Sequence, residues 1–104
     1  MTENALIAEA EGFFCDQFDG VVRIEITDEG CAVWVDGRSA PPTISASSPQ
    51  GLTRQFCLWR VEAADLSVIL SGTQARLEHS MVAGRLHVSG DMSVMMRLEK
   101  VRHG

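Results

Sequence analysis

Residues 84–92 read Gly84-Arg85-Leu86-His87-Val88-Ser89-Gly90-Asp91-Met92, a short alternating segment held between two glycines. Leu86 and Val88 share one face, which predicts a strand over residues 85–89. Gly90-Asp91 predicts a turn, and Asp91 is suited to cap a following helix. Residues 92–101 fit both a helix face and strand alternation, and their methionines and leucine favour the helix.

The segments upstream of this stretch predict two short helices and a strand. Residues 62–71 and 73–83 each carry a helical stripe, and each is followed by a glycine, Gly72 or Gly84, that suits a C-terminal cap. Residues 55–61 are apolar on both faces. This pattern predicts a central strand covered on both sides of the sheet.

The N-terminal half predicts a helix followed by a hairpin. Residues 4–18 space apolar side chains at helical steps, whereas residues 21–27 and 31–36 alternate like half-buried strands. Residues 28–30, ending in glycine, suit the loop of a hairpin between them, and residues 43–46 predict one more short strand. Because strands precede most of the helices, we expect one α+β domain over residues 1–104, a mainly antiparallel sheet with helices on one face.

Composition excludes several classes of protein. The chain has 104 residues, 45% hydrophobic and 22% charged, which is ordinary for a folded domain and unlike disorder. Net charge is −5, which argues against a basic nucleic-acid binder. No apolar run is long enough for a membrane span, and the N-terminus does not resemble a secretory signal. We therefore expect a cytoplasmic protein. Arginine supplies eight of the nine basic residues, which is typical of a high-GC bacterial genome.

Charge is distributed unevenly along the chain. Residues 1–36 hold nine acidic residues and one basic residue, a net charge of −8, whereas residues 37–104 carry +3. Such asymmetry indicates either an interaction face or chance differences between solvated faces.

The three cysteines, Cys15, Cys31 and Cys57, do not form a disulfide framework, because their number is odd and their spacing wide. We expect buried thiols that pack as small hydrophobic groups in a reducing compartment.

Catalytic and metal-binding motifs are missing from the sequence. Asp65 with Glu78 and His79 could in principle form an acid/base set, but ordinary surface polar residues explain them better. The histidines, including His87, are scattered, and no metal-ligand spacing occurs. We expect no catalytic residue, no metal and no cofactor.

The segment 84–92 resembles the signature of the sterol-carrier-protein-type (SCP-2-like) lipid-binding family. That family shows glycine, a basic residue, two aliphatic residues flanking an exposed one, Ser or Thr, glycine and Asp or Asn, and then a Met- or Leu-rich segment such as residues 92–98. Residues 64–72 resemble the family's Asp-led helix ending in glycine. The resemblance covers about residues 56–101, and the N-terminal hairpin only in outline. Residues 39–55 have no clear counterpart, and the helix before Gly84 lacks the family's proline and is one residue longer.

The resemblance implies a twisted five-stranded sheet with an apolar tunnel between the sheet and the helices, including N-terminal and C-terminal helices. It implies binding of a fatty acid, a sterol-like lipid or an isoprenoid, without chemistry of its own. Methionines clustered near the C-terminus suit a surface that accepts varied apolar shapes, although plain core packing is the alternative for every candidate. The candidate ligand-binding residues are Ile24, Val33, Val35, Trp59, Leu66, Leu70, Leu77, Met81, Met92, Met95, Met96 and Leu98. Arg23 or Arg60 could meet a lipid head group, but each is better explained as exposed or ion-paired.

The function is therefore expected to be non-catalytic carriage of an apolar lipid. An accessory protein in a lipid or quinone biosynthetic complex, with a protein partner, is the first alternative. A pocket recruited as an enzyme for an apolar metabolite is the second. Nucleic acid is not expected as a partner, and membrane contact is expected to be at most transient.

Overall fold

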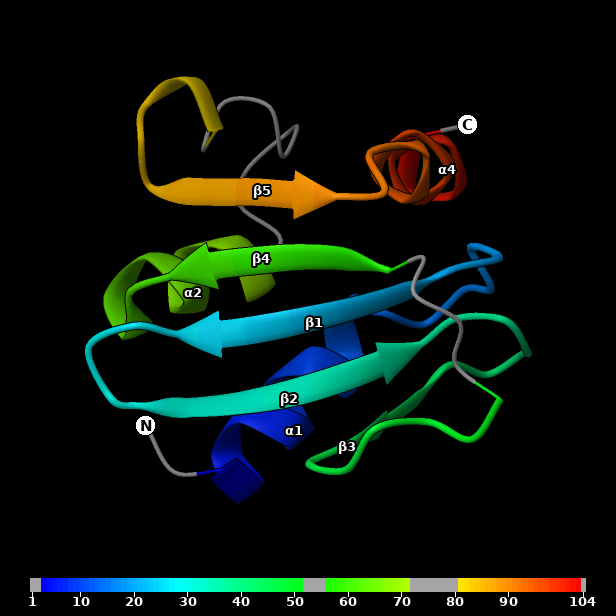
Figure 1. Ribbon diagram of the computed structural model, residues 1–104, viewed down its shortest axis with the longest axis horizontal. Helices are drawn as coiled ribbons and strands as arrows, with labels where there is room; N and C mark the ends of the chain where they lie inside the picture. The colour runs from blue at the N-terminus through cyan, green and yellow to red at the C-terminus, as the bar shows by residue number, and fades with distance from the viewer. Residues whose placement is uncertain (1–2, 52–55, 72–80, 104) are drawn as a thin grey trace.

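The computed structural model describes residues 3–51, 56–71 and 81–103, which form a five-stranded sheet with helices packed against it (Figure 1). In chain order the elements are α1 (Glu3–Phe13), β1 (Val21–Ile26), β2 (Cys31–Asp36), β3 (Thr43–Ser45), β4 (Cys57–Val61), α2 (Ala63–Leu70), β5 (Leu86–Gly90) and α4 (Ser93–His103). The strand order is β3-β2-β1-β4-β5, and every neighbouring pair is antiparallel except β1 and β4. The expected α+β fold with a mainly antiparallel sheet is confirmed.

The predicted hairpin is present and fixes which side chains enter the core. Ile24 of β1 pairs with Val33 of β2, and on its other side β1 places Ile24 beside Trp59 of β4. All three side chains are completely buried on the face that the helices cover. Arg23 and Glu25, which alternate with them, point to the opposite face and are half-buried.

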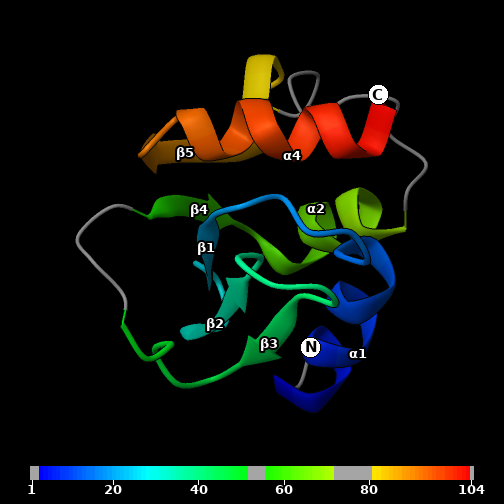
Figure 2. The same ribbon diagram turned by 90° about the vertical axis from the view of Figure 1, so that its right-hand side faces the viewer.

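Helices α1 and α2 lie behind the sheet in Figure 1, and α4 lies at its β5 end in both views (Figure 2). Leu6 and Ala10 of α1, Leu66 and Ile69 of α2, and Leu98 of α4 are buried in one hydrophobic cluster with the sheet. The predicted stripe on α2 is thus confirmed. Among the described residues no helix is both long enough and apolar enough to span a bilayer.

Helix α1 ends at Phe13, so the prediction of a helix over residues 4–18 is wrong for its last five residues. The backbone N–H groups of Phe18 and Asp19 donate to the carbonyl oxygen of Gly37, at 3.2 and 2.9 Å. Because these donors are used across the chain, they are not available for helical bonds. Phe14 and Phe18 are still buried, which is why their spacing looked helical.

Strand β4 is an interior strand, but the expectation that both of its faces are covered is wrong. Cys57, Trp59 and Val61 are buried on the helix side, whereas Arg60 on the other side is exposed. The centre of the sheet is β1 instead. Before β4 begins, Phe56 packs edge-on against Trp34, with the ring centroids 5.0 Å apart, which shields part of the open face.

The chain turns sharply between β5 and α4. Gly90 has a φ of +82°, and the N–H of the next residue, Asp91, donates to the carbonyl oxygen of Phe56 at 3.1 Å. Asp91 Oδ1 then accepts the backbone N–H of Ser93 at 3.1 Å, so the predicted cap is present. Hydrogen bonds from the Ser93 hydroxyl and backbone hold the pKa of Asp91 below its usual value. The helical alternative for residues 92–101 is confirmed.

Part of the predicted helix over residues 73–83 lies outside the described residues, which resume with Met81 and Val82 in helical conformation. The predicted strand over residues 43–46 is confirmed at Thr43–Ser45, on the edge of the sheet.

Arg38 organises the start of the segment that lacks a family counterpart. Its guanidinium holds the Asp36 carboxylate through two hydrogen bonds of 2.9 Å and lowers the pKa of that carboxyl. The same guanidinium donates to the carbonyl oxygens of Gln50 and Gly51, at 2.9 and 3.2 Å. These bonds join the end of β2 to the loop that follows β3.

Candidate functional site

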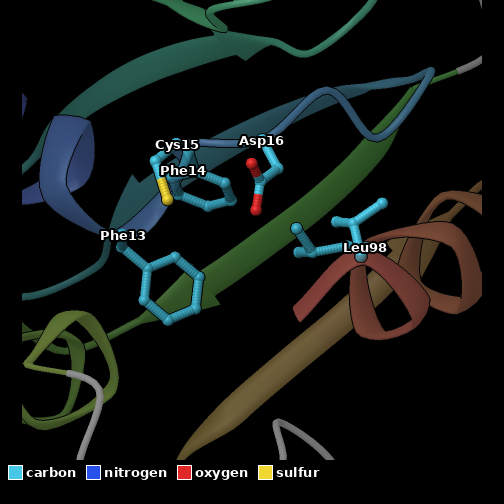
Figure 3. Close-up of a pocket in the computed structure, with 6 residues that line it drawn as sticks. Phe13, Phe14, Cys15, Asp16 and Leu98 are labelled. Atoms are coloured by element: carbon cyan, nitrogen blue, oxygen red, sulfur yellow. The ribbon is translucent and has the colours of Figure 1, made fainter. Parts of the chain in front are cut away.

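A pocket of about 190 Å³ opens between the segment that follows α1 and the facing side of α4. Six residues line it: Phe13, Phe14, Cys15, Asp16, Leu98 and Val101. Figure 3 shows Phe13 and Phe14 on one wall and Leu98 opposite, with the Asp16 carboxylate directed toward the space between Phe14 and Leu98. The early end of α1 is what frees residues 14–16 to form this wall.

Aromatic side chains separate the pocket from the face of the sheet that the helices cover. The rings of Phe13 and Phe14 lie 6.5 and 5.7 Å from the indole of Trp59, measured between centroids. Trp59 is completely buried, and its indole N–H donates to the sulfur of Met95 at 3.0 Å. Since the indole donor is satisfied, this aromatic layer needs no water and remains apolar.

The rim of the pocket is polar on one side only. Cys15 and Asp16 are exposed, and Asp16 is the one charged residue among the six that line the pocket. The expectation that all three cysteines are buried is wrong for Cys15, and Cys31 is only half-buried. Cys57 is buried under the helices, and burial raises the pKa of its thiol to about 12. That thiol is neutral and acts as a small hydrophobic group.

The structure gathers eight of the twelve candidate ligand-binding residues in the buried cluster between sheet and helices. These are Ile24, Val33, Val35, Trp59, Leu66, Leu70, Met95 and Leu98. Met81 is partly buried and packs against the cluster, whereas Met92 and Met96 are exposed. Leu77 lies outside the described residues. As ligand contacts, all twelve stay predictions.

Of those twelve, Leu98 is the one that lines the pocket, and sequence reasoning missed the other five lining residues. Phe13, Phe14, Cys15 and Asp16 fell within the predicted helix, where their side chains were read as core or surface. The sequence feature that could have indicated this wall is the adjacent pair Phe13-Phe14, which holds two of the four phenylalanines in the chain.

Arg23 and Arg60 do not face this pocket. Both side chains lie on the open face of the sheet and share Glu25, with nitrogen–oxygen distances of 3.0 and 3.4 Å. Arg23 also lies over the ring of Trp34, 5.1 Å from its centroid. They are ion-paired, as the sequence favoured, and are unavailable to a head group on the helix side.

A shallower pocket of about 420 Å³ lies beside the ends of β1 and β4, lined by Thr27, Arg60, His87, Val88 and Ser89. An adjoining pocket of about 190 Å³ places Asp65 and Glu62 near Arg60 and His87, so opposite charges offset one another there. Glu78 and His79, the other candidates for an acid/base set, lie outside the described residues. Within the described part of the chain, no group of His, Cys, Asp and Glu side chains is arranged to hold a metal ion.

Comparison with known proteins agrees with this architecture. The model of the SCP-2 sterol transfer family matches residues 14–102. Among solved structures, the sterol carrier protein 2 of Yarrowia lipolytica in its apo form superposes with a TM-score of 0.61 at 12% identity, over 91% of this chain and 80% of that one. A protein described as UbiJ-SCP2, a ubiquinone synthesis protein, superposes with a TM-score of 0.58 at 15% identity, over 93% of this chain and 76% of that one.

Identities this low establish the shared fold alone. No curated protein matches the sequence closely enough to count as a relative. The family match covers most of the chain, and the superposed structures share its fold. The chain belongs to the SCP-2 sterol transfer family.

Proposed function

We propose that the protein binds one apolar lipid without catalysis, in the space between the sheet and the helices, reached through the pocket between residues 13–16 and α4. The observation that supports this most is the position of the pocket. Its walls, Phe13, Phe14 and Leu98, are themselves members of the buried cluster, so a ligand entering there continues directly into apolar surroundings.

The pocket must widen to take a whole lipid. Its volume of about 190 Å³ lies below the ~300–1,000 Å³ of typical small-molecule sites. Two features allow widening: Met95 behind the wall has an adaptable side chain, and residues 14–18 lie outside regular structure. A bound lipid then replaces protein packing with lipid packing, and binding to the native state stabilises it.

Asp16 favours a lipid with a neutral head group. It is an exposed acidic residue beside the opening. A fatty-acid carboxylate held near it would meet like-charge repulsion, whereas a sterol hydroxyl or a quinone carbonyl would not. We therefore infer a preference for sterol-like or isoprenoid ligands over fatty acids.

When a sterol or an isoprenoid quinone is added to the delipidated protein, its thermal unfolding temperature is expected to rise. Native mass spectrometry is expected to show one bound ligand per protein chain. Val101→Phe, at the pocket wall, is expected to weaken binding roughly tenfold, which is about 1.4 kcal/mol. Val68→Phe is the matched control, because Val68 is similarly exposed but lies on α2, away from the lining residues. Equal effects of the two valine variants on ligand binding would contradict the assigned pocket.

Asp16→Asn is expected to improve the binding of a fatty acid and to leave the binding of the quinone unchanged.

An accessory role in quinone assembly is the second candidate. The superposed protein described as UbiJ-SCP2 is a ubiquinone synthesis protein, and residues 1–36 of this chain supply the strong negative charge that a basic partner would recognise. Co-purification of a quinone-biosynthetic enzyme with the native protein would favour this role. A native mass spectrum that shows only the protein chain, with neither lipid nor partner bound, would count against both candidate functions.

A further inference from the structure

We propose that the indole N–H of Trp59 donates a hydrogen bond to a neutral oxygen of the bound lipid, so that the site prefers ketones and quinones to hydrocarbons of the same shape. This inference rests on the lipid binding proposed above and adds the chemistry that the buried end of the ligand carries. The indole N–H is a donor with no acceptor capacity, and the Trp59 side chain is completely buried. Its hydrogen-bond partner is therefore decided by the groups that reach it inside the core.

The groups that the structure places at this N–H carry sulfur. Trp59 Nε1 lies 3.0 Å from the sulfur of Met95. The Cys57 thiol is also within reach: burial raises the pKa of this thiol to about 12, and a hydrogen bond from Trp59 offsets part of the rise. Thioether and thiol sulfur are both weak acceptors. A carbonyl oxygen on a ligand is a stronger acceptor than either, so it gains more from this buried donor.

Met95 is the side chain that an entering ligand displaces. It precedes Leu98 by three residues on the buried side of α4, and Leu98 forms one wall of the pocket (Figure 3). Widening of the pocket behind Leu98 therefore moves Met95, whose unbranched side chain changes rotamer readily. Once its sulfur has moved, the indole N–H of Trp59 has lost that partner in an apolar core, which is costly. An oxygen on the ligand removes this cost, whereas a hydrocarbon does not.

The position of the donor also sets the orientation of the ligand. The rings of Phe13 and Phe14 lie between the pocket and Trp59, with centroids 6.5 and 5.7 Å from the indole. The oxygen of the ligand therefore lies beyond these rings, and the hydrocarbon end lies toward the opening. A carboxylate that took the same path would pass the acidic residue Asp16 and then lose its water in the core. A neutral carbonyl group loses much less, which favours ketones and quinones over fatty acids.

Two probes separate the oxygen from the rest of the ligand: cholestanone carries one ketone, and cholestane has the same carbon skeleton without the oxygen. Delipidated wild-type protein is expected to bind cholestanone about tenfold more tightly than cholestane, by competition in native mass spectrometry. In Trp59→Phe, which keeps an aromatic ring but has no N–H, the two affinities are expected to be equal. Trp34→Phe is the matched control, because Trp34 lies on the opposite face of the sheet, and it should keep the wild-type preference.

Nuclear magnetic resonance reads the hydrogen bond itself. Trp34→Phe leaves Trp59 as the one tryptophan, so its protein gives a single indole N–H signal. Cholestanone is expected to move this proton signal to lower field, and cholestane is expected to leave it without such a shift. A residue that only packed against the ligand would not distinguish the two probes in this way.

Three outcomes would overturn the inference. Equal affinity of the wild type for the two probes would do so and would leave lipid binding itself in place. A preference for cholestanone that Trp59→Phe retains would assign the oxygen to another donor. Binding of neither probe would contradict the proposed function, and the inference would fall with it. Circular dichroism checks that Trp59→Phe is folded, and if it is not, the indole signal of Trp34→Phe decides the question.

Discussion

Gly90→Ala is expected to destabilise the protein by about 3 kcal/mol or more, measured as the free energy of unfolding in urea. Two causes act together. Gly90 has a φ of +82°, a conformation that an L side chain adopts only under strain. A Cβ at this position would also lie well inside van der Waals contact of the Phe56 carbonyl oxygen, which is backbone and cannot rotate away.

The clash would propagate into the sheet and the C-terminal helix. Gly90 pairs with Cys57 across β4 and β5, and the same Phe56 oxygen accepts the N–H of Asp91 just before α4. Moving that oxygen therefore disturbs the last strand pair and the start of α4 together. A substitution that only strained its own φ would leave both in place.

Gly84→Ala is the matched control for this first prediction. Gly84 has a similar φ of +75°, but a Cβ there would meet no atom within 4 Å. Its cost should be only that of the left-handed conformation, about 1–2 kcal/mol. Equal losses of stability at the two glycines would show that contact with Phe56 contributes nothing.

Trp59→Ala is expected to cost about 3–5 kcal/mol of unfolding free energy, the usual range for truncating a buried large aromatic residue. Trp59 of β4 is completely buried between the sheet and the helices, and it packs against Phe13 and Phe14. Removing the indole leaves a cavity below the pocket and takes away the donor to the Met95 sulfur. Urea unfolding monitored by far-ultraviolet circular dichroism measures the loss without depending on tryptophan fluorescence.

Met95→Leu separates packing from the hydrogen bond. Leucine keeps nearly the same volume but offers no acceptor, so the Trp59 N–H would be left unpaired, at a cost of about 1–3 kcal/mol. The loss should stay below that of Trp59→Ala. A Trp59→Ala variant that loses less stability than Met95→Leu would refute the account of this core.

The strands were predictable because alternation is a local property of the sequence. Val22, Ile24 and Ile26 alternate with charged residues, and Gly30 provides the positive φ of the hairpin turn. The strand and the turn can therefore be predicted from residues that are close together in the sequence. The end of α1 was not predictable in this way. It depends on the Gly37 carbonyl oxygen, which lies about twenty residues further along the chain than the N–H groups that it receives.

The candidate site was predicted in part for the same reason. Apolar residues such as Trp59 and Met95 were placed correctly in the space between sheet and helices, because burial follows from hydrophobic patterning. The pocket needs residues 13–16 to face α4, a contact between the two ends of the chain that no local pattern reveals. Met92 and Met96 were predicted to bind ligand on the same ground as Met95, because all three belong to the methionine-rich C-terminal segment. The helical geometry instead directs Met92 and Met96 outward.

Fluorescence quenching by a brominated sterol tests the location of the ligand most directly. Trp34→Phe leaves Trp59 as the one tryptophan, next to the aromatic wall of the pocket, and quenching of Trp59 is expected to rise to saturation at one ligand per protein. Trp59→Phe leaves Trp34 on the opposite face of the sheet, and its fluorescence is expected to stay unquenched. Saturable quenching of Trp34 but not of Trp59, or of neither, would contradict an apolar ligand held between the sheet and the helices.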